Sequence, residues 1–376
     1  MNESSIYVHI PFCNHKCIYC DFYSIITSEN IDNFLQSLLT EIKFYSNNYA
    51  DGRVFSTIFF GGGTPSLMKP EFLGRIISEL KNNFNISKDT EITMETNPGT
   101  VDKKKLIQFY KSGINRISIG IQSFHNEDLS FLTRIHNKET AIETVYNSVD
   151  AGFENINIDL IFNLPNQTKD KWKQNLETSI SLPVKHISAY SLILERGTIL
   201  NKMVLDKKVT LREEDYDAEL YEMAIDYLTA AGFGQYEVSN FAKQGFECRH
   251  NKAYWRYNEY LGFGPSAHSF AEGRRWWNYS SLKQYIKEID VKNMATCGDE
   301  LLSEEQKLDE YIMLALRSYG LELKDFTKKF GEKWLQKNQK YIQTLINENF
   351  IERNKDFLRL TKHGYLVCDE ILKNLL

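Results

Sequence analysis

The chain has 376 residues, of which 42% are hydrophobic and 25% charged, which is ordinary for a soluble globular protein. Its 45 Lys and Arg residues against 50 Asp and Glu residues give a formal charge of −5, which does not favour nucleic acid as a partner. The N-terminal residues are too few and too polar for a secretory leader, and no apolar run approaches the ~20 residues of a membrane span. We therefore expect a cytoplasmic protein whose six cysteines are reduced or bind metal.

From residue 5 to residue 241, short apolar runs alternate with longer charged segments of helical periodicity. The predicted strands are Ile6–Ile10, Thr57–Phe60, Glu91–Glu95, Arg116–Ile121, Asn155–Phe162 and His186–Leu192. The predicted helices are Asp32–Tyr45, Glu71–Asn82, Lys103–Lys111, Lys138–Ala151, Lys169–Ser179 and Glu213–Ala230. Six such units predict a parallel α/β sheet, either open and doubly wound or curled into a partial (β/α)6 TIM-like barrel. Polar candidates at the ends of successive strands favour the barrel, whose site lies at that edge.

The rest of the chain predicts two further parts, so we divide it into a core barrel (1–241), a connecting segment (242–300) and a C-terminal domain (301–376). Within the connecting segment, residues 246–282 are rich in aromatic residues, glycine and histidine, and show no clear periodicity. The C-terminal part predicts helices over Leu308–Tyr319, Leu323–Phe330 and Lys333–Asn347, a hairpin turning at Asn354–Lys355, and a last helix. This order is typical of a small helical, winged-helix-like domain. Its mixed charges argue against DNA binding.

Three cysteines, Cys13, Cys17 and Cys20, lie in one loop directly after the first predicted strand. Thiolates bind both zinc and iron–sulfur clusters, but a structural zinc site takes four ligands. Three thiolates on a four-iron cluster leave one iron open to another ligand, whereas most such clusters take four cysteines. The spacing C-x3-C-x2-C, with Tyr19 before the last cysteine, resembles the radical S-adenosylmethionine (SAM) superfamily. The resemblance implies a [4Fe–4S] cluster whose open iron binds SAM.

Later motifs, including "FFGGGTPS", "METNPGT", "SIGIQSF" and "NIDLIFNLP", resemble the coproporphyrinogen oxidase-like branch of this superfamily. The resemblance implies that SAM is bound by Tyr7, Tyr19, Gly62, Gly63, Thr64, Glu95, Gln122, Arg134, Asp159 and Ile193. Carboxylates suit ribose hydroxyls and an ammonium group, and a guanidinium suits the SAM carboxylate. Taken alone, each residue also has a plain structural explanation. A polar residue can be a hydrogen-bonded group at a strand end, the glycines can form a tight turn, and Ile193 can belong to the apolar core. The ordered set favours a SAM site.

Two functions remain open within this branch. One is the oxygen-independent coproporphyrinogen III oxidase, and the other is the HemW-type haem chaperone, which binds haem and passes it to acceptor proteins. The oxidases resemble C-x3-C-x2-C-x-C and carry an extension before the cluster; here Phe22 takes the place of the fourth cysteine, and Cys13 lies near the start. We therefore expect the chaperone, and doubt oxidase activity. Its implied partners are haem, a haem-accepting protein such as one of the respiratory chain, and an electron donor such as a flavodoxin if SAM is cleaved.

The segment "RHNKAYW" supplies the candidate haem residues, since it matches the HNxxYW motif of the HemW-type proteins. The matching residues are His250, Asn251, Tyr254 and Trp255. A neutral imidazole can bind haem iron, and neighbouring aromatic rings can cover a porphyrin face. By chemistry alone, His250 would more often be a hydrogen-bonded loop histidine than a haem ligand. The match to the motif favours the haem ligand instead. Weaker candidate ligands or contacts are Cys248, His268 and the pair Arg274–Arg275.

Overall fold

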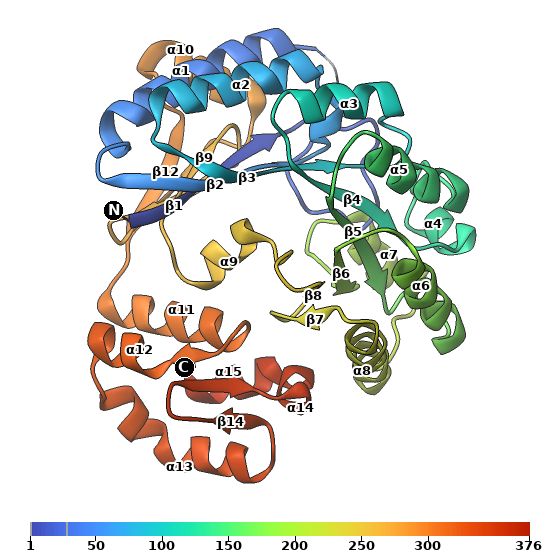
Figure 1. Ribbon diagram of the computed structural model, residues 1–376, viewed down its shortest axis with the longest axis vertical. Helices are drawn as coiled ribbons and strands as arrows, with labels where there is room; N and C mark the ends of the chain where they lie inside the picture. Colours follow the sequence, from blue (N-terminus) through green and yellow to red (C-terminus); the bar gives the residue numbers. More distant parts are fainter. Residues whose placement is uncertain (1, 28) are drawn as a thin grey trace.

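The computed structural model describes residues 2–27 and 29–376 of the chain. Its centre is a run of parallel strands that are neighbours in sequence order and curl into an incomplete barrel (Figure 1). These strands are β1 (Asn2–Ile10), β2 (Arg53–Gly62), β3 (Ile86–Thr96), β4 (Arg116–Gln122), β5 (Asn155–Phe162) and β6 (His186–Ser191). The partial α/β barrel expected from the alternating pattern is confirmed, and the open doubly wound alternative is wrong.

Helices connect these strands and cover their outer face (Figure 1). Those on the outer face are α1 (Ile31–Tyr49), α2 (Pro70–Asn83), α3 (Lys103–Lys111), α5 (Lys138–Asp150), α6 (Lys169–Ser181) and α8 (Glu214–Ala230). The shorter helices α4 (Asn126–Phe131) and α7 (Ile199–Leu205) contribute to a separate apolar cluster with Ile18 of the loop after β1. Local chemistry sets several of the helix starts. The side chains of Asp102, Asn137 and Thr168 accept backbone hydrogen bonds at the first turns of α3, α5 and α6.

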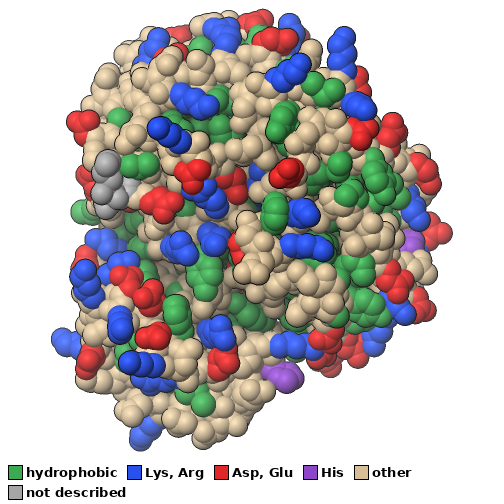
Figure 2. All heavy atoms as spheres, viewed as in Figure 1, with side chains coloured by type: hydrophobic (Ala, Val, Ile, Leu, Met, Phe, Trp, Pro, Cys, Tyr) green, Lys and Arg blue, Asp and Glu red, His purple; other side chains and the backbone are tan. Residues whose placement is uncertain are grey.

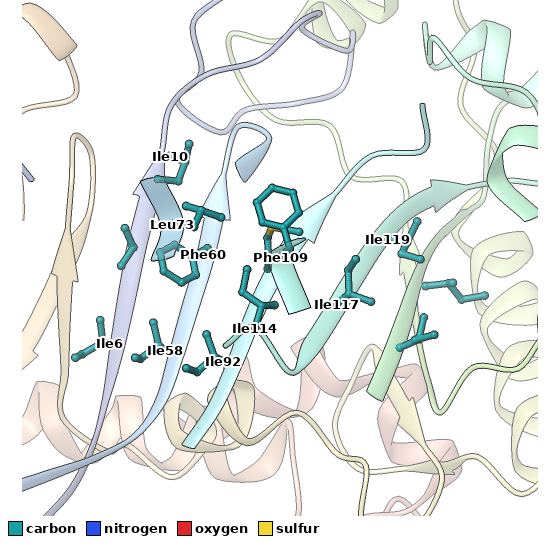
Figure 3. Packing of buried hydrophobic residues seen from close by; sticks show 14 of the residues in the cluster. Ile6, Ile10, Ile58, Phe60, Leu73, Ile92, Phe109, Ile114, Ile117 and Ile119 are labelled. Carbon is teal, nitrogen blue, oxygen red and sulfur yellow. The ribbon is translucent and has the colours of Figure 1, made fainter. Parts of the chain in front are cut away.

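The two faces of the barrel strands have different chemistry. Residues at alternate positions, such as Ile6, Ile58, Ile92 and Ile117, point outward and form one apolar cluster with the helices (Figure 3). Their side chains are fully or almost fully buried. The intervening positions point into the barrel. The register between β2 and β3 places Thr57 beside Glu91, so inward-pointing residues of neighbouring strands lie next to each other.

The segment without clear periodicity extends the sheet beyond β1 instead of merely connecting two parts. It follows β7 (Gly234–Gln235) and β8 (Asn240–Ala242), which pair beside β6, and contains α9 (Arg249–Trp255), β9 (Tyr260–Phe263), β10 (His268–Ala271), β11 (Arg274–Asn278), α10 (Leu282–Lys292) and β12 (Thr296–Leu301). Strand β9 pairs in parallel with β1, and helix α9 lies against the inner side of β1 and β2 (Figure 1). These strands are too short to give a period in the sequence.

The C-terminal part forms its own apolar core, which includes Phe326, Trp334 and Leu358. Its elements are α11 (Glu304–Leu316), β13 (Leu321–Glu322), α12 (Leu323–Phe330), α13 (Lys333–Asn347), β14 (Ile351–Arg353), β15 (Phe357–Leu360), α14 (Lys362–Leu366) and α15 (Cys368–Leu375). The predicted helices and hairpin are found in the expected order. Lys and Arg side chains lie among Asp and Glu on the face shown in Figure 2, and several form ion pairs, such as Arg317 with Asp369.

Across the residues that the structure describes, no helix is both long enough and apolar enough to cross a membrane.

Candidate cofactor and ligand site

The inner face of the barrel carries mostly polar side chains. A parallel sheet covered on both faces usually has apolar residues on both. Here the inward positions hold Tyr7, His9, Thr57, Glu91, Glu95, Arg116, Ser118, Asn157, Asp159, His186 and Ser188. Most of these side chains are buried, so they are removed from water and must find partners inside the protein. A polar interior of this kind indicates a binding site rather than a packed core.

A hydrogen-bonded network joins the inward residues of β4, β5 and β6. The amide of Asn157 donates to Asp159 Oδ1 at 2.8 Å and to Ser118 Oγ at 2.7 Å, and its Oδ1 lies 2.5 Å from His186 Nδ1. Burial raises the pKa of Asp159, although Asn157 and the fully buried Arg116 oppose that shift. The network therefore holds Asp159 in one orientation inside the barrel.

The three cysteines lie on the loop that leaves the carboxyl end of β1. Cys13, Cys17 and Cys20 are free and half-buried, so their thiols remain reachable. The Cys13 amide donates to the Ile25 carbonyl at 2.9 Å, and the Cys20 amide donates to the Cys17 carbonyl at 3.2 Å. The loop thus presents three thiols at the mouth of the barrel. Within the described residues, no three His, Cys, Asp or Glu side chains converge as they would on one metal ion.

The glycine run after β2 supports this cysteine loop. The Gly63 amide donates to the Ile10 carbonyl and the Thr64 amide to the Phe12 carbonyl, both at 2.8 Å. A Cβ atom on Gly63 would lie 2.6 Å from the Phe12 carbonyl oxygen, so only glycine fits this approach. The Thr64 hydroxyl lies 3.3 Å from Cys13 Sγ. The glycine run therefore holds the start of the cysteine loop in place, and the backbone of the glycine run lies at the barrel mouth.

Arg134 connects the later strand ends to the cysteine loop. Its Nη2 donates to Asn97 Oδ1 and to the Gly120 carbonyl, both at 2.5 Å, and its Nη1 lies 3.6 Å from Cys17 Sγ. Asn97 in turn donates to the Thr64 hydroxyl at 3.0 Å. Sequence reasoning did not single out Asn97, although it follows directly after the third strand. Tyr19 lies beside Arg134, and burial raises the pKa of its hydroxyl.

Glu95 occupies the end of β3, where its Oε2 accepts a hydrogen bond from the Gly62 amide at 3.2 Å. Burial raises the pKa of Glu95 to about 8, and the nearby Asp159 carboxylate adds to this shift. Two carboxyl groups in one buried interior repel each other when both are ionised. Glu95 is therefore mostly protonated at neutral pH while no cation lies beside it, and a bound cation would favour its charged form.

We expect this raised pKa to make the stability of the cofactor-free protein depend on pH. In the folded protein Glu95 keeps its proton up to about pH 8, whereas in the unfolded chain it loses it near the ordinary value of ~4.3. Its contribution to the free energy of unfolding should therefore fall as pH rises through this window, by at most ~1.4 kcal/mol per pH unit. Urea unfolding of wild type and Glu95→Gln at several pH values measures the difference. A difference that does not change with pH would contradict the assignment.

A cavity of 420 Å³ opens between the cysteine loop, the first two strands and helix α9. Its lining residues are Tyr7, His9, Asp21, Phe22, Tyr23, Phe59, His250, Asn251, Tyr254, Tyr260, Ser266 and His268. Tyr7, expected at the SAM site, therefore shares one cavity with three of the expected haem residues. Phe22, which stands where the oxidases have a fourth cysteine, is 63% exposed at its rim. The aromatic lining suits a flat apolar ligand.

His250 lies inside the wall of this cavity and is only 2% exposed. Its Nδ1 lies 2.8 Å from the Thr57 hydroxyl and its Nε2 lies 3.1 Å from the Tyr254 hydroxyl. Its ring stacks on Phe59 with 4.9 Å between centroids, and meets Tyr254 edge to face at 4.8 Å. Burial lowers the pKa of His250 to about 3, with Arg116 adding to the effect, so the imidazole is neutral.

Glu91 holds the N-terminal end of α9 inside the barrel. Its Oε2 accepts from the Arg249 amide and its Oε1 from the His250 amide, both at 3.2 Å. The Cys248 thiol donates to the same Oε1 at 3.6 Å, and burial raises the pKa of this thiol to about 12. Cys248 is therefore a buried, protonated anchor of α9. Sequence reasoning did not single out Glu91, which was seen only as the first residue of a predicted strand.

The remaining residues predicted from the sequence lie at different distances from the cavity and the cysteine loop. Gln122 ends β4 with φ 72°, next to a register shift in the pairing with β5, and such rare backbone conformations often occur at functional sites. Ile193 follows β6 and is 67% exposed, so no pocket encloses it in this structure. Trp255 ends α9 and does not line the cavity. Arg275 pairs with Glu310 at 2.8 Å, which ties β11 to α11.

Comparisons with known proteins agree with this arrangement. The model of the Radical SAM superfamily matches residues 7–178, and that of the HemN C-terminal domain matches residues 302–367. Proteins named heme chaperone HemW from Lactococcus lactis subsp. lactis (strain IL1403) and Bacillus subtilis (strain 168) are each 33% identical, covering 99% and 98% of this chain and 97% of each relative. The solved coproporphyrinogen III oxidase HemN of Escherichia coli, described as a radical SAM enzyme, has a TM-score of 0.84 at 23% identity and covers 100% of this chain and 90% of its own.

The curled parallel sheet and the three-cysteine loop at its mouth define a radical SAM protein. The likeness to HemN, at its low identity, shows the fold alone. The relatives named heme chaperone HemW match from end to end at 33% identity, and the chain therefore belongs to the HemW family of radical SAM proteins.

Proposed function

We propose that this protein binds haem in the 420 Å³ cavity beside helix α9 and passes it to an acceptor protein. The observation that carries the proposal is the likeness, over 99% of the chain, to proteins named heme chaperone HemW. The cavity supports it, because His250, Asn251 and Tyr254 of the HNxxYW segment form one wall. Its volume lies within the usual range for small-molecule and cofactor pockets, roughly 300–1,000 Å³.

The aromatic side chains would hold the flat faces of the porphyrin. Phe59 comes from β2, whereas Tyr254 and Tyr260 come from the neighbouring elements α9 and β9, so two segments far apart in the sequence surround one space. Contacts between Tyr254 and Tyr260, edge to face at 4.7 Å, keep this wall stiff. On the open side, the exposed ring of Phe22 offers apolar surface where haem would enter and leave. An accessible rim suits a cargo that must be released to another protein.

We further propose that Cys13, Cys17 and Cys20 bind a [4Fe–4S] cluster and that SAM is held beside it. The donor set fits this cluster, because three free thiols on one loop are soft ligands. Next to them lies the backbone of Gly62 and Gly63, which carries no side chain that would keep a ligand away. When bound, the cluster would supply an electron for one-electron chemistry on SAM. Arg134 would orient the SAM carboxylate from its fixed position beside Asn97. Glu95, near the end of β3, and Asp159, on the inward face of β5, would receive the amino group and the ribose hydroxyls.

One pair of assays tests the proposed function. The protein is reconstituted with iron and sulfide without oxygen, and is then titrated with haem while the absorption spectrum is recorded. A parallel sample receives coproporphyrinogen III, SAM and a reductant, and its products are separated. We expect saturable haem binding, transfer of the haem to an apo-protein acceptor, and no decarboxylation of the porphyrinogen. Turnover of the porphyrinogen, or the absence of saturable haem binding, would overturn the proposal.

A further inference from the structure

Three histidines line the cavity among the residues that the structure describes, and two of them have no free ring nitrogen. In His9, Nε2 lies 2.9 Å from the Tyr23 carbonyl and so donates to it, which leaves Nδ1 to accept from the Tyr7 hydroxyl at 3.1 Å. In His250, both nitrogens are likewise bonded to hydroxyl groups inside the wall. A metal ligand needs a free lone pair on one ring nitrogen. Neither ring offers one without losing a buried hydrogen bond.

His268 differs from both. It begins β10, is exposed, and lines the same cavity. Within the described part of the chain its ring nitrogens have no hydrogen-bond partner, and its ring is held instead by stacking on Trp277 at 5.8 Å between centroids and 27° between planes. Trp277 lies directly opposite His268 in the β10–β11 pairing, so the strand register fixes this stack. The ring is oriented, while both of its nitrogens remain available.

The electrostatic surroundings keep this imidazole neutral. Partial desolvation in the cavity lowers the pKa of His268, and the nearby Arg275 guanidinium lowers it further, while Glu300 opposes them. A neutral imidazole carries the lone pair that binds iron. By contrast, a haem iron could reach His250 Nε2 only after the Tyr254 hydroxyl had moved away, because that hydroxyl lies 3.1 Å from it.

We propose that His268, rather than His250, supplies the imidazole that binds the haem iron, an inference that rests on the proposed haem-binding function. His250 then serves as part of the cavity wall, where it fixes Tyr254 and Phe59 against the porphyrin. The iron ligand lies on β10, whereas His250, Tyr254 and Phe59 lie on α9 and β2, so haem would bridge β10 and the α9–β2 side of the cavity.

Haem titration of four proteins tests this assignment: wild type, His268→Ala, His250→Ala and the control His363→Ala. His363 is an exposed histidine of the C-terminal part. We expect His268→Ala to weaken haem binding by at least about tenfold and to lose the imidazole signature in resonance Raman and electron paramagnetic resonance spectra. Added imidazole should restore that signature in His268→Gly. His250→Ala should keep the signature even where its affinity falls, and His363→Ala should match wild type.

The outcomes separate the two proposals. A wild-type protein that binds no haem overturns the proposed function. Saturable wild-type binding with an unchanged imidazole signature in His268→Ala overturns the ligand assignment alone. Because the His268 side chain is exposed, its removal should leave the melting temperature unchanged. A second variant, His268→Gln, keeps the size and polarity of the site without an imidazole, and a retained signature there would also refute the assignment.

Discussion

Replacing Cys17 with serine should abolish the iron–sulfur cluster that we propose for the loop after β1. Wild-type protein reconstituted without oxygen should hold about four iron atoms per chain, and Cys17→Ser should hold almost none. A hydroxyl is a hard and poor ligand for this cluster, and a loop with only three thiols has no spare ligand. Cys17 Sγ also accepts a hydrogen bond from Arg134 Nη1 at 3.6 Å. Iron and sulfide analysis together with the visible absorption spectrum measures the loss.

The matched control is Cys297→Ser, because Cys297 is also free but lies exposed on β12, outside the cysteine loop. This variant should hold as much iron as wild type. The melting temperature of both cofactor-free variants should remain unchanged, since Cys17 is only half-buried and its sulfur packs in no apolar core. Full iron content in Cys17→Ser would show that the cluster, if present, has other ligands.

Sequence periodicity located the barrel well because its strands are long and have one fully apolar face. The prediction for β5 matches the structure at both ends, since Asn155 and Phe162 bound an uninterrupted strand. The pattern failed after residue 242, where β9 and β10 have four residues each. Over so short a run, alternation cannot be distinguished from chance. Positive φ angles at Gly264 and Ser266 turn the chain sharply between them, and this shape has no period to detect.

The position of a candidate site residue was predictable where the residue lies at the end of its own strand. It was unpredictable where the fold brings together two elements far apart in the sequence. Glu95 could be expected at the barrel mouth because parallel strands end at the same edge, whereas Asp159 lies within β5. Thr57 could not be assigned a role, since its partner His250 is 193 residues away along the chain. The sequence also could not reveal that both nitrogens of His250 are bonded, and this is what moves the proposed iron ligand to His268.

Helix α9 has seven residues, which is too short to be stable without tertiary contacts. It nevertheless supplies one wall of the cavity in which we propose that haem binds, and it touches α11 of the C-terminal part on its other side. Its position depends on Glu91, whose carboxylate accepts from two backbone amides and the Cys248 thiol, and on Thr57. The inward face of β2 and β3 therefore determines where α9 lies. We expect the shape of the cavity to depend on Glu91 more than on any exposed residue of α9.

Glu91→Ala should accordingly lower the free energy of unfolding by about 3–5 kcal/mol, because three buried donors lose their acceptor together and the buried Arg116 loses a neighbouring charge. Haem affinity should fall as well, since α9 is no longer fixed. Glu91→Gln keeps one acceptor oxygen and should lose less stability. The control is Glu247→Ala, which removes a half-buried carboxylate 3.8 Å from Lys252 and should cost less than ~1 kcal/mol. Urea unfolding and haem titration measure both effects. If Glu91→Ala and Glu247→Ala were equally stable, Glu91 would not be the anchor of this helix.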